Sequence, residues 1–227
     1  MQQSKSTGPY CYEHPRPAVT VDTAVFRLAD DKLQLLLIRR RRPPFAGTWA
    51  LPGGFVDPEE PLAAAAQREL REETALTGLP IEQLRAFGKP DRDPRGRTIS
   101  VAFLALLGPE LPVRPCASDD ADDVAWFDAH DLPALAFDHA DIVSYAIDRL
   151  RDKLQYADAA ARLLEARFTL SALQRAYELI LNKPLDKRNF RRRMLRTGRF
   201  QAMDQTVRQG AHRPARLYRL IEDSQET

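Results

Sequence analysis

The sequence contains little cysteine and no long apolar run. Its two cysteines, Cys11 and Cys116, are too few for a disulfide framework and lack the paired spacing of a metal site. Apolar runs stay well short of the roughly 18 residues that a membrane-spanning helix needs, and the polar, proline-bearing residues 1–17 contain no apolar signal core. These absences argue against a secreted disulfide scaffold and a membrane protein, so we expect a cytoplasmic protein.

Charge is balanced over the whole chain but not along it. The 227 residues have a net charge of +2, with 29% charged and 44% hydrophobic residues, which is an ordinary globular composition. Residues 183–220, however, contain twelve Lys or Arg against two Asp, an excess of ten positive charges, so the remainder carries an excess of eight negative charges. This asymmetry predicts a basic module that meets a polyanion, joined to an acidic module.

The first two thirds of the chain mix β-rich and helical patterns. A loose arm over residues 1–17 is expected before a domain over 18–156, with a loop over 86–97. The predicted strands are 18–28 and 32–40, as a hairpin, then 98–107 and 122–128, and the predicted helices are about 58–74 and 139–156. Because strands and helices do not alternate regularly, the pattern favours an α+β fold, a sandwich around a mixed sheet.

The last third of the chain has a different sequence pattern. An alanine-rich helical connector is expected over 157–167, followed by a domain over 168–223. The predicted elements of that domain are a helix over 169–182 capped by Thr169 or Ser171, a basic helix over 186–198 ended by Gly198, and β-like pieces at about 199–208 and 214–221. Helix, turn, basic helix and hairpin form the outline of a winged helix-turn-helix.

Three acids crowd onto one predicted helix behind a glycine pair. On a helical wheel Glu69, Glu72 and Glu73 share one arc beside the apolar arc, so their carboxylates can converge. Like charges at this spacing repel, whereas hard divalent cations such as Mg²⁺ prefer oxygen ligands. The turn at Gly53 and Gly54 would let backbone carbonyls approach such an ion. A solvated helix face with fortuitous acids is the alternative interpretation.

The spacing of the whole segment adds to this interpretation. It closely resembles the Nudix box, with alanine where the family pattern has glycine near its end, and the matching residues are Gly54, Glu60, Arg68, Glu69, Leu70, Glu72, Glu73, Ala75 and Leu76. The resemblance implies a Nudix α/β/α sandwich over about residues 18–150. It also implies hydrolysis of a nucleoside diphosphate linked to another moiety.

The resemblance to the Nudix box also implies residue roles. Its metal ligands for Mg²⁺ or Mn²⁺ would be Glu69, Glu72 and Glu73 with a carbonyl near Gly53, and Glu60 and Arg68 would complete the catalytic set as an orienting pair. The metal ion would bridge phosphate oxygens and activate a water for attack on phosphorus.

Arginines outside the box are candidates for ligand binding. Arg39 and Arg40 open a run of four arginines at a strand end, where they can neutralise a pyrophosphate. Arg92 and Arg95 lie in the loop 88–96, at the distance from the box where ADP-ribose-type Nudix proteins carry a proline-marked specificity loop. A charged strand end in solvent is the alternative for the first pair.

Two further assignments stay open. Trp49, a candidate ligand contact, and Phe87 either stack on a base or pack against other side chains. The general base is not identified, because a solvated acidic loop is the alternative to a catalytic acid among Asp119, Asp120, Asp122 and Asp123.

The basic helix predicts a surface for nucleic acid. Its apolar side is expected to hold Phe190, Met194 and Leu195, with the basic residues outward. The expected DNA contacts are to phosphates from Lys187, Arg188, Arg191, Arg192 and Arg196, to base edges from Asn189 or Arg193, and at the minor groove from His212 and Arg213. A solvated helix with a basic face is the alternative.

With residues 168–174 and 213–220, this helix resembles the winged-helix domain of Nudix-related transcriptional regulators of NAD metabolism. That resemblance implies a homodimer that binds double-stranded operator DNA and whose Nudix domain senses ADP-ribose. The first hypothesis is therefore an ADP-ribose-responsive regulator that also hydrolyses its ligand with Mg²⁺. The alternatives are primarily a Mg²⁺-dependent ADP-ribose pyrophosphatase, whose C-terminal domain serves dimerisation or an accessory role, and an enzyme acting on a capped RNA end.

Overall fold

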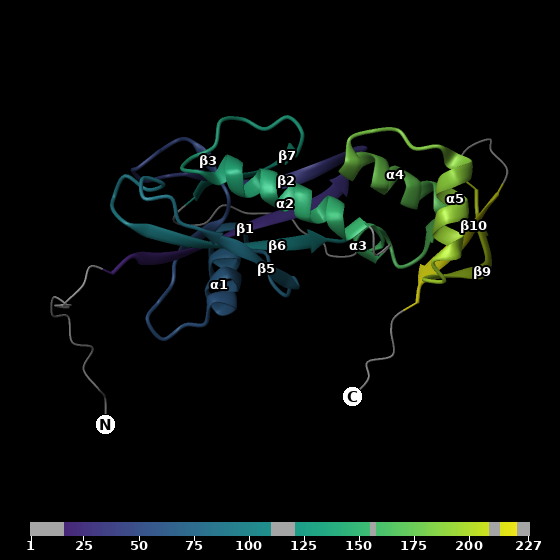
Figure 1. Ribbon diagram of the computed structural model, residues 1–227, viewed down its shortest axis with the longest axis horizontal. Coiled ribbons are helices and arrows are strands. Elements are labelled where there is room, and N and C mark those ends of the chain that lie inside the picture. Colours follow the sequence, from purple (N-terminus) through teal and green to yellow (C-terminus); the bar gives the residue numbers. More distant parts are fainter. Residues whose placement is uncertain (1–15, 110–120, 155–157, 209–213, 222–227) are drawn as a thin grey trace, which may run out of the picture.

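The structure, a computed structural model, describes residues 16–109, 121–154, 158–208 and 214–221. Figure 1 shows a large sheet with helices on both faces and a smaller unit of two helices and a small sheet at one end. The predicted α+β fold, a Nudix-type sandwich followed by a winged helix, is confirmed. No helix within the described ranges is both long and apolar enough to cross a lipid bilayer.

The large sheet is mixed. Its path runs β3-β2-β1-β6-β5, with β1 antiparallel to β2 and parallel to β6, while β4 pairs with β1 and β7 with β2. The bounds are β1 Ala18–Ala29, β2 Lys32–Arg40, β3 Trp49–Ala50, β4 Gly53–Phe55, β5 Ile81–Phe87, β6 Thr98–Leu107 and β7 Ala121–Asp128. The expected hairpin is present: its turn residues Asp30 and Asp31 have φ of 50° and 58°, as a tight two-residue hairpin requires.

One strand was missed. β5 ends at Phe87, so Ala86 and Phe87 lie in a strand rather than in the predicted loop 86–97. β5 pairs only with β6 in the described sheet, and most of its side chains are partly or fully exposed. A half-exposed edge strand carries little hydrophobic periodicity, which is why the sequence pattern did not reveal it.

Helices cover both faces of the large sheet (Figure 1). Helix α1, Leu62–Thr74, packs Ala65, Ala66 and Leu70 against one face of β1 and its neighbours. Helix α2, His139–Lys153, covers the other face. The alternation of β1 explains the two layers, because successive side chains of a strand point to opposite faces: Val25 faces α1, and Phe26 faces α2.

The box helix begins later than predicted, at residue 62 rather than about 58. Pro61 is its N-cap with an extended ψ of 145°, and the Glu60 N–H closes a turn onto the Asp57 carbonyl at 3.1 Å. Glu60 therefore lies in the turn before the helix, from where its side chain reaches back to the helix surface. The helix ends at Ala75, which adopts the left-handed conformation with φ 59°.

The expected helical connector is shorter than predicted. Helix α3 covers only Asp158–Ala161, and a turn leads to strand β8, Phe168–Thr169. Ala160 and Leu163 are buried at 0% and 1% exposure. The segment therefore packs as part of the core. Helix α2 ends at Lys153, and the last two residues of its predicted range lie outside the described residues.

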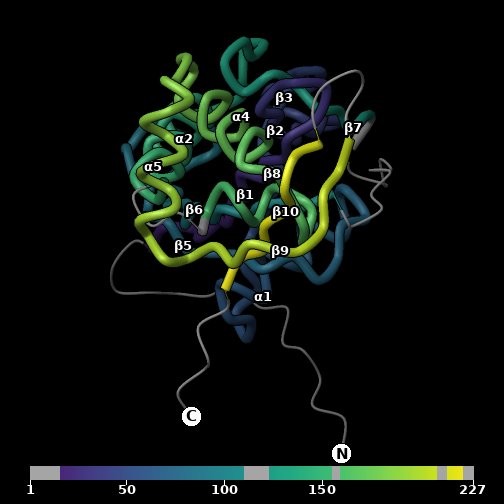
Figure 2. The backbone as a smooth tube through the Cα atoms, turned by 90° about the vertical axis from the view of Figure 1, so that its right-hand side faces the viewer, coloured from purple at the N-terminus to yellow at the C-terminus, as the bar shows by residue number. Residues whose placement is uncertain are grey.

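The C-terminal unit has the predicted winged-helix order. Its elements are α4 Leu170–Leu181, α5 Lys187–Arg196, β9 Phe200–Val207 and β10 Ala215–Leu220, and β8 joins the last two in a sheet of order β8-β10-β9. The Thr169 hydroxyl caps α4 by accepting from the Ala172 N–H at 3.0 Å, and Asp186 caps α5 by accepting from the Asn189 N–H at 2.8 Å. Figure 2 shows this end of the molecule facing the viewer.

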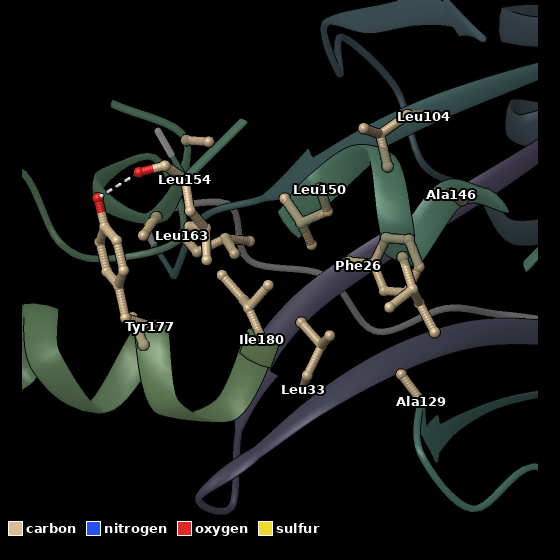
Figure 3. Close-up of a cluster of buried hydrophobic side chains, with 14 of the residues drawn as sticks. Phe26, Leu33, Leu104, Ala129, Ala146, Leu150, Leu154, Leu163, Tyr177 and Ile180 are labelled. Atoms are coloured by element: carbon tan, nitrogen blue, oxygen red, sulfur yellow. Dashed lines mark hydrogen bonds between the residues drawn. The ribbon is translucent and has the colours of Figure 1, made fainter. Parts of the chain in front are cut away.

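One hydrophobic cluster runs through both parts of the chain. Leu154, Leu163, Tyr177 and Ile180 pack in the same cluster as Leu33 of the large sheet (Figure 3). The buried Tyr177 hydroxyl donates to the Leu154 carbonyl at 3.1 Å, which ties α4 to the end of α2. The winged helix is therefore seated on the sandwich through apolar contacts and a hydrogen bond.

Candidate functional site

Strand β4 approaches helix α1 closely because two of its residues, Gly53 and Gly54, lack a side chain; both lie in this short strand rather than in the predicted turn. The Gly53 N–H donates to Glu73 Oε2 at 2.8 Å. A Cβ on Gly53 would lie 2.1 Å from the Val21 carbonyl oxygen, and a Cβ on Gly54 would lie 2.4 Å from Glu69 Oε1. A side chain at Gly53 would clash with backbone, so only glycine fits there, whereas one at Gly54 would displace the Glu69 carboxylate. The glycine pair thus sets the distance between the β4 backbone and two of the box carboxylates.

Arg68 is the centre of an ion-pair network on the box. Its guanidinium donates to both carboxylate oxygens of Glu60 at 2.9 Å, to Glu69 at 2.7 Å and to Glu72 at 3.2 Å. It also donates to the Phe55 carbonyl at 3.0 Å, which fastens β4 to the helix. Hydrogen bonds to Glu60 raise the pKa of Arg68, and the same bonds lower the pKa of Glu60.

Two box carboxylates are placed where negative charge is unfavourable. Burial raises the pKa of Glu73 to about 8, with Glu69 and Asp22 adding repulsion and the Gly53 N–H opposing it. Burial also raises the pKa of Glu69. Burial therefore favours the protonated form of both carboxylates, and a cation bound beside them would favour the charged form.

The chemistry of these donors fits a hard divalent cation. Three carboxylates on two turns of one helix and a backbone loop supply the oxygen ligands that Mg²⁺ and Mn²⁺ prefer. Within the described ranges, no group of three His, Cys, Asp or Glu side chains is gathered in coordinating geometry. Instead, the Arg68 guanidinium lies between Glu69 and Glu72 and supplies the positive charge that both carboxylates contact.

A buried polar network supports the loop from below. The Leu51 N–H donates to His139 Nδ1 at 2.9 Å, and His139 Nε2 lies 3.4 Å from Asp22 Oδ1. Burial lowers the pKa of His139, so the ring is neutral with its proton on Nε2, facing Asp22. Asp22 also accepts from the Ser100 hydroxyl. This network was missed, because its members are far apart in the sequence and no local pattern joins them.

The two arginines of the 88–96 loop have different environments. The Arg92 side chain is 3% exposed, donates to Asp138 at 2.6 Å and lies 3.6 Å from Asp22, so it ties the loop to the start of α2. The Arg95 side chain is 41% exposed and pairs with Asp93 at 2.7 Å. Of the two predicted ligand contacts, the structure presents Arg95 to solvent and turns Arg92 into the interior.

An arginine-aromatic cluster lies beside the box, formed by Arg40, Arg95, Phe45, Phe55 and Phe137. Arg40 lies over the Phe137 ring at 4.7 Å, and Arg95 lies over Phe55 at 4.9 Å and Phe137 at 5.6 Å. Phe45 and Phe55 are 43% and 46% exposed. Burial and the Arg95 charge lower the pKa of Arg40, while the box residue Glu73 acts in the opposite direction. The cluster thus offers cations and aromatic faces next to the carboxylates.

The other candidates of the first domain are placed as follows. The exposed Arg39 donates from Nε to the Gly47 carbonyl at 3.1 Å. Trp49 is half-buried edge-to-face with Phe127 at 4.7 Å, and Phe87 is 7% exposed, so both pack against other side chains. The Asp123 side chain accepts from the adjacent Val124 N–H. The other acids named as general bases are outside the described side chains: Asp119, Asp120 and Asp122.

Helix α5 presents a basic outer surface. Phe190 and Met194 are buried at 3% and 2% exposure, as predicted, but Leu195 is 52% exposed and does not belong to the apolar side. Leu195 lies about 100° from Met194 around the helix, which turns it toward solvent. The exposed residues are Lys187, Arg188, Asn189, Arg191, Arg192, Arg193 and Arg196, whereas His212 and Arg213 lie outside the described residues.

The fold and the site define a class: a Nudix domain, with its carboxylate box on α1, joined to a basic winged helix. Residues 18–146 match the model of the NUDIX domain, and residues 160–220 match that of the NrtR DNA-binding winged helix domain. The chain belongs to the Nudix family and, within it, to the NrtR-type proteins that carry this second domain.

Known proteins resemble this chain over more than half of its length. An ADPR-responsive transcriptional repressor, NtrR, of Acinetobacter baylyi is 38% identical, covering 91% of this chain and 83% of the relative. An ADP-ribose pyrophosphatase of Methanocaldococcus jannaschii is 45% identical, covering 56% of this chain and 71% of the relative. The crystal structure of Shewanella oneidensis NrtR complexed with a 27mer DNA has a TM-score of 0.72 and 33% identity, covering 89% of this chain and 93% of that one.

Proposed function

We propose that the protein is an ADP-ribose-responsive, DNA-binding transcriptional regulator of the type that controls NAD metabolism. It acts in the cytoplasm as a homodimer on double-stranded operator DNA. Its Nudix domain, residues 18–156, binds ADP-ribose or a related nucleoside diphosphate derivative and hydrolyses it with Mg²⁺ or Mn²⁺. The connector 157–167 joins it to the DNA-binding domain, residues 168–223.

The observation that carries this proposal is the continuous core between the two domains. The buried cluster includes Tyr177 and Ile180 of α4 together with Leu150 and Leu154 of α2. The Arg151 side chain donates to the Ile180 carbonyl at 3.3 Å, and His130 Nε2 lies 2.8 Å from the Leu179 carbonyl. A ligand that shifts α2 therefore has a packed route to the helix pair that meets DNA.

The arginine-aromatic cluster has the chemistry of a nucleoside diphosphate site. Arg40 and Arg95 provide two cations beside the box, which can pair with the two negative charges of a pyrophosphate. The exposed rings of Phe45 and Phe55 offer faces on which a purine can stack. The relative from Acinetobacter baylyi, whose name states that it responds to ADPR, supports ADP-ribose as the ligand.

The box residues fit a hydrolytic role. Glu69, Glu72 and Glu73 with the Gly53 backbone would hold the metal ion, which supplies a polarised phosphate and an activated water when bound. Arg68 keeps Glu69 and Glu72 side by side, and Glu60 fixes the Arg68 guanidinium from the turn before the helix.

The basic helix supports DNA binding. Its outward arginines can neutralise several phosphates at once, which predicts an affinity that falls steeply with salt. As a homodimer the protein would present two such helices to two half-sites of an operator. The structure of the Shewanella oneidensis relative with DNA supports this use of the winged helix.

A second function, primarily that of a Mg²⁺-dependent ADP-ribose pyrophosphatase, is favoured by the complete set of box carboxylates. The Methanocaldococcus jannaschii relative carries that name. In this alternative the C-terminal domain would serve dimerisation or an accessory role.

The test incubates the full chain with ADP-ribose and Mg²⁺ and follows the products by chromatography. Glu72→Gln is the control, because its side chain is 50% exposed and the change removes a charge without creating a cavity. Turnover to AMP and ribose 5-phosphate that is lost in the control supports hydrolysis. Thermal stabilisation by ADP-ribose without turnover supports a sensor that does not hydrolyse its ligand. The absence of both turnover and stabilisation would refute ADP-ribose as the ligand.

A further inference from the structure

Leu195 is out of place on the surface of α5. It is 52% exposed, although the helix is otherwise polar outside and buries its other apolar residues, Phe190 and Met194, below 4%. Residues three, four and seven positions earlier are Arg192, Arg191 and Arg188, so on a helix they share a face with Leu195. One aliphatic side chain therefore stands within a basic face.

The neighbouring polar side chains are held aside. Arg192 donates to Asn189 Oδ1 at 2.9 Å, one turn back along the helix. The Arg193 guanidinium lies over the rings of Tyr177 and Phe190 at 5.6 and 5.8 Å, on the flank that meets α4. These contacts draw two long side chains toward the N-terminal half and the flank of the helix, and they leave Leu195 uncovered.

A leucine on a DNA-reading helix has one apolar target. Phosphates and most base edges in the major groove present charge, donors or acceptors, which a leucine cannot satisfy. The 5-methyl group of thymine is the apolar feature of that groove, and contact with it is a known means of telling thymine from the other bases. Burying Leu195 against a polar edge instead would desolvate that edge without a hydrogen bond.

We propose that Leu195 is a specificity-determining residue that packs on the 5-methyl group of a thymine in the operator, while the arginines around it contact phosphates. This inference rests on the proposed DNA-binding function. It assigns to one residue a sequence preference that the basic charge of α5 does not provide, since phosphate contacts are the same for every sequence.

The experiment first selects duplexes that bind the full-length protein from a random pool. Each thymine of a selected duplex is then replaced in turn by deoxyuridine, which lacks only the 5-methyl group, and affinity is measured by fluorescence anisotropy at one salt concentration. We expect one thymine per half-site whose replacement weakens binding by about 4-fold, the effect of one buried methyl group.

The variants separate this contact from a general loss of binding. In Leu195→Ala and Leu195→Gln the same thymine replacement should change affinity by less than about 2-fold, because its partner is gone. Leu195→Ala should leave the dependence of log K on log salt unchanged, whereas Arg192→Ala should reduce that slope by about 1. Ile221→Ala is the matched control, because it truncates another aliphatic residue, 41% exposed, that is not part of the helix.

The outcomes distinguish a failure of the proposed DNA-binding function from a failure of the assignment of Leu195. If no duplex binds above the non-specific background, the proposed DNA-binding function fails. If a duplex binds but no thymine replacement matters, or if it matters equally in Leu195→Ala, the assignment of Leu195 is overturned. A flat thymine scan combined with loss of the dimer in Leu195→Ala would also overturn it, because Leu195 would then pack on a second copy of the chain.

Discussion

The end of the box helix offers a direct test of the structure. Ala75 ends α1 with φ 59° and ψ 10°, and its N–H donates to the Arg71 carbonyl at 2.9 Å. An L-residue with a Cβ pays about 1–2 kcal/mol for the left-handed conformation. Replacing it by glycine removes that strain, at a cost of about 0.4–1 kcal/mol for the greater freedom of the unfolded chain. Ala75 is exposed, so little buried area is lost.

We therefore expect Ala75→Gly to raise the free energy of unfolding by about 0.5–1 kcal/mol. For a chain of this size the midpoint of thermal unfolding should rise by roughly 1–3 °C. The measurement is thermal and urea unfolding of the metal-free protein, followed by circular dichroism.

The reverse change provides a matched control in the following loop. Gly78 also has a positive φ, 71°, and a Cβ there would meet no described atom within 4 Å. Gly78→Ala therefore tests conformation alone and should destabilise by about the same amount. Destabilisation by Ala75→Gly would refute the left-handed backbone assigned to this helix end, and no effect of Gly78→Ala would refute the positive φ of Gly78.

Three further outcomes are expected. Gly54→Ala, whose Cβ would lie 2.4 Å from Glu69 Oε1, should displace that carboxylate and abolish stabilisation by Mg²⁺ in a thermal shift assay. Retained stabilisation would contradict the close approach of β4 and α1. The pKa of Glu73 is raised from 4.5 to about 8, so between these pH values the folded protein holds a proton on Glu73 that the unfolded chain releases. The free energy of unfolding of the metal-free protein, relative to Glu73→Gln, should therefore fall as pH rises from about 5 to 8. A difference between the two proteins that does not change with pH would refute the raised pKa. Arg92→Ala should lower the free energy of unfolding, measured in urea, by about 3–5 kcal/mol, because it leaves Asp138 buried without its partner. Arg95→Ala, which removes an exposed side chain, should lower it by no more than about 1 kcal/mol. Equal losses would show that Arg92 is not buried.

Local sequence patterns predicted the strands and helices in which buried residues follow one another or recur at helical spacing. The β-branched run at the start of β1 and the helical spacing of Leu173, Ala176, Tyr177 and Ile180 in α4 both matched the structure. The exposed edge strand β5 was not visible, because only its last residue, Phe87, is buried.

The box illustrates the same limit at the level of the site. The resemblance to the Nudix box implied that Glu60 and Arg68 form a pair, and the structure joins them. The contact of His139 with Leu51, 88 positions away in the sequence, depends on how α2 crosses the sheet. The burial of Arg92 depends on Asp138, which lies 46 positions away. Such contacts follow from tertiary packing, and no periodicity within one segment encodes them.

The central claim is that the ligand and the DNA are linked through one protein. Its most direct test titrates a selected duplex with full-length protein, with and without saturating ADP-ribose, using the Glu72→Gln variant in metal-free buffer so that the ligand persists. Binding of ADP-ribose is verified in parallel by thermal shift. The account predicts that ADP-ribose changes the apparent Kd for DNA by at least about 5-fold, and that DNA changes the affinity for ADP-ribose by the same factor. Identical DNA-binding curves in the presence of bound ADP-ribose would contradict it.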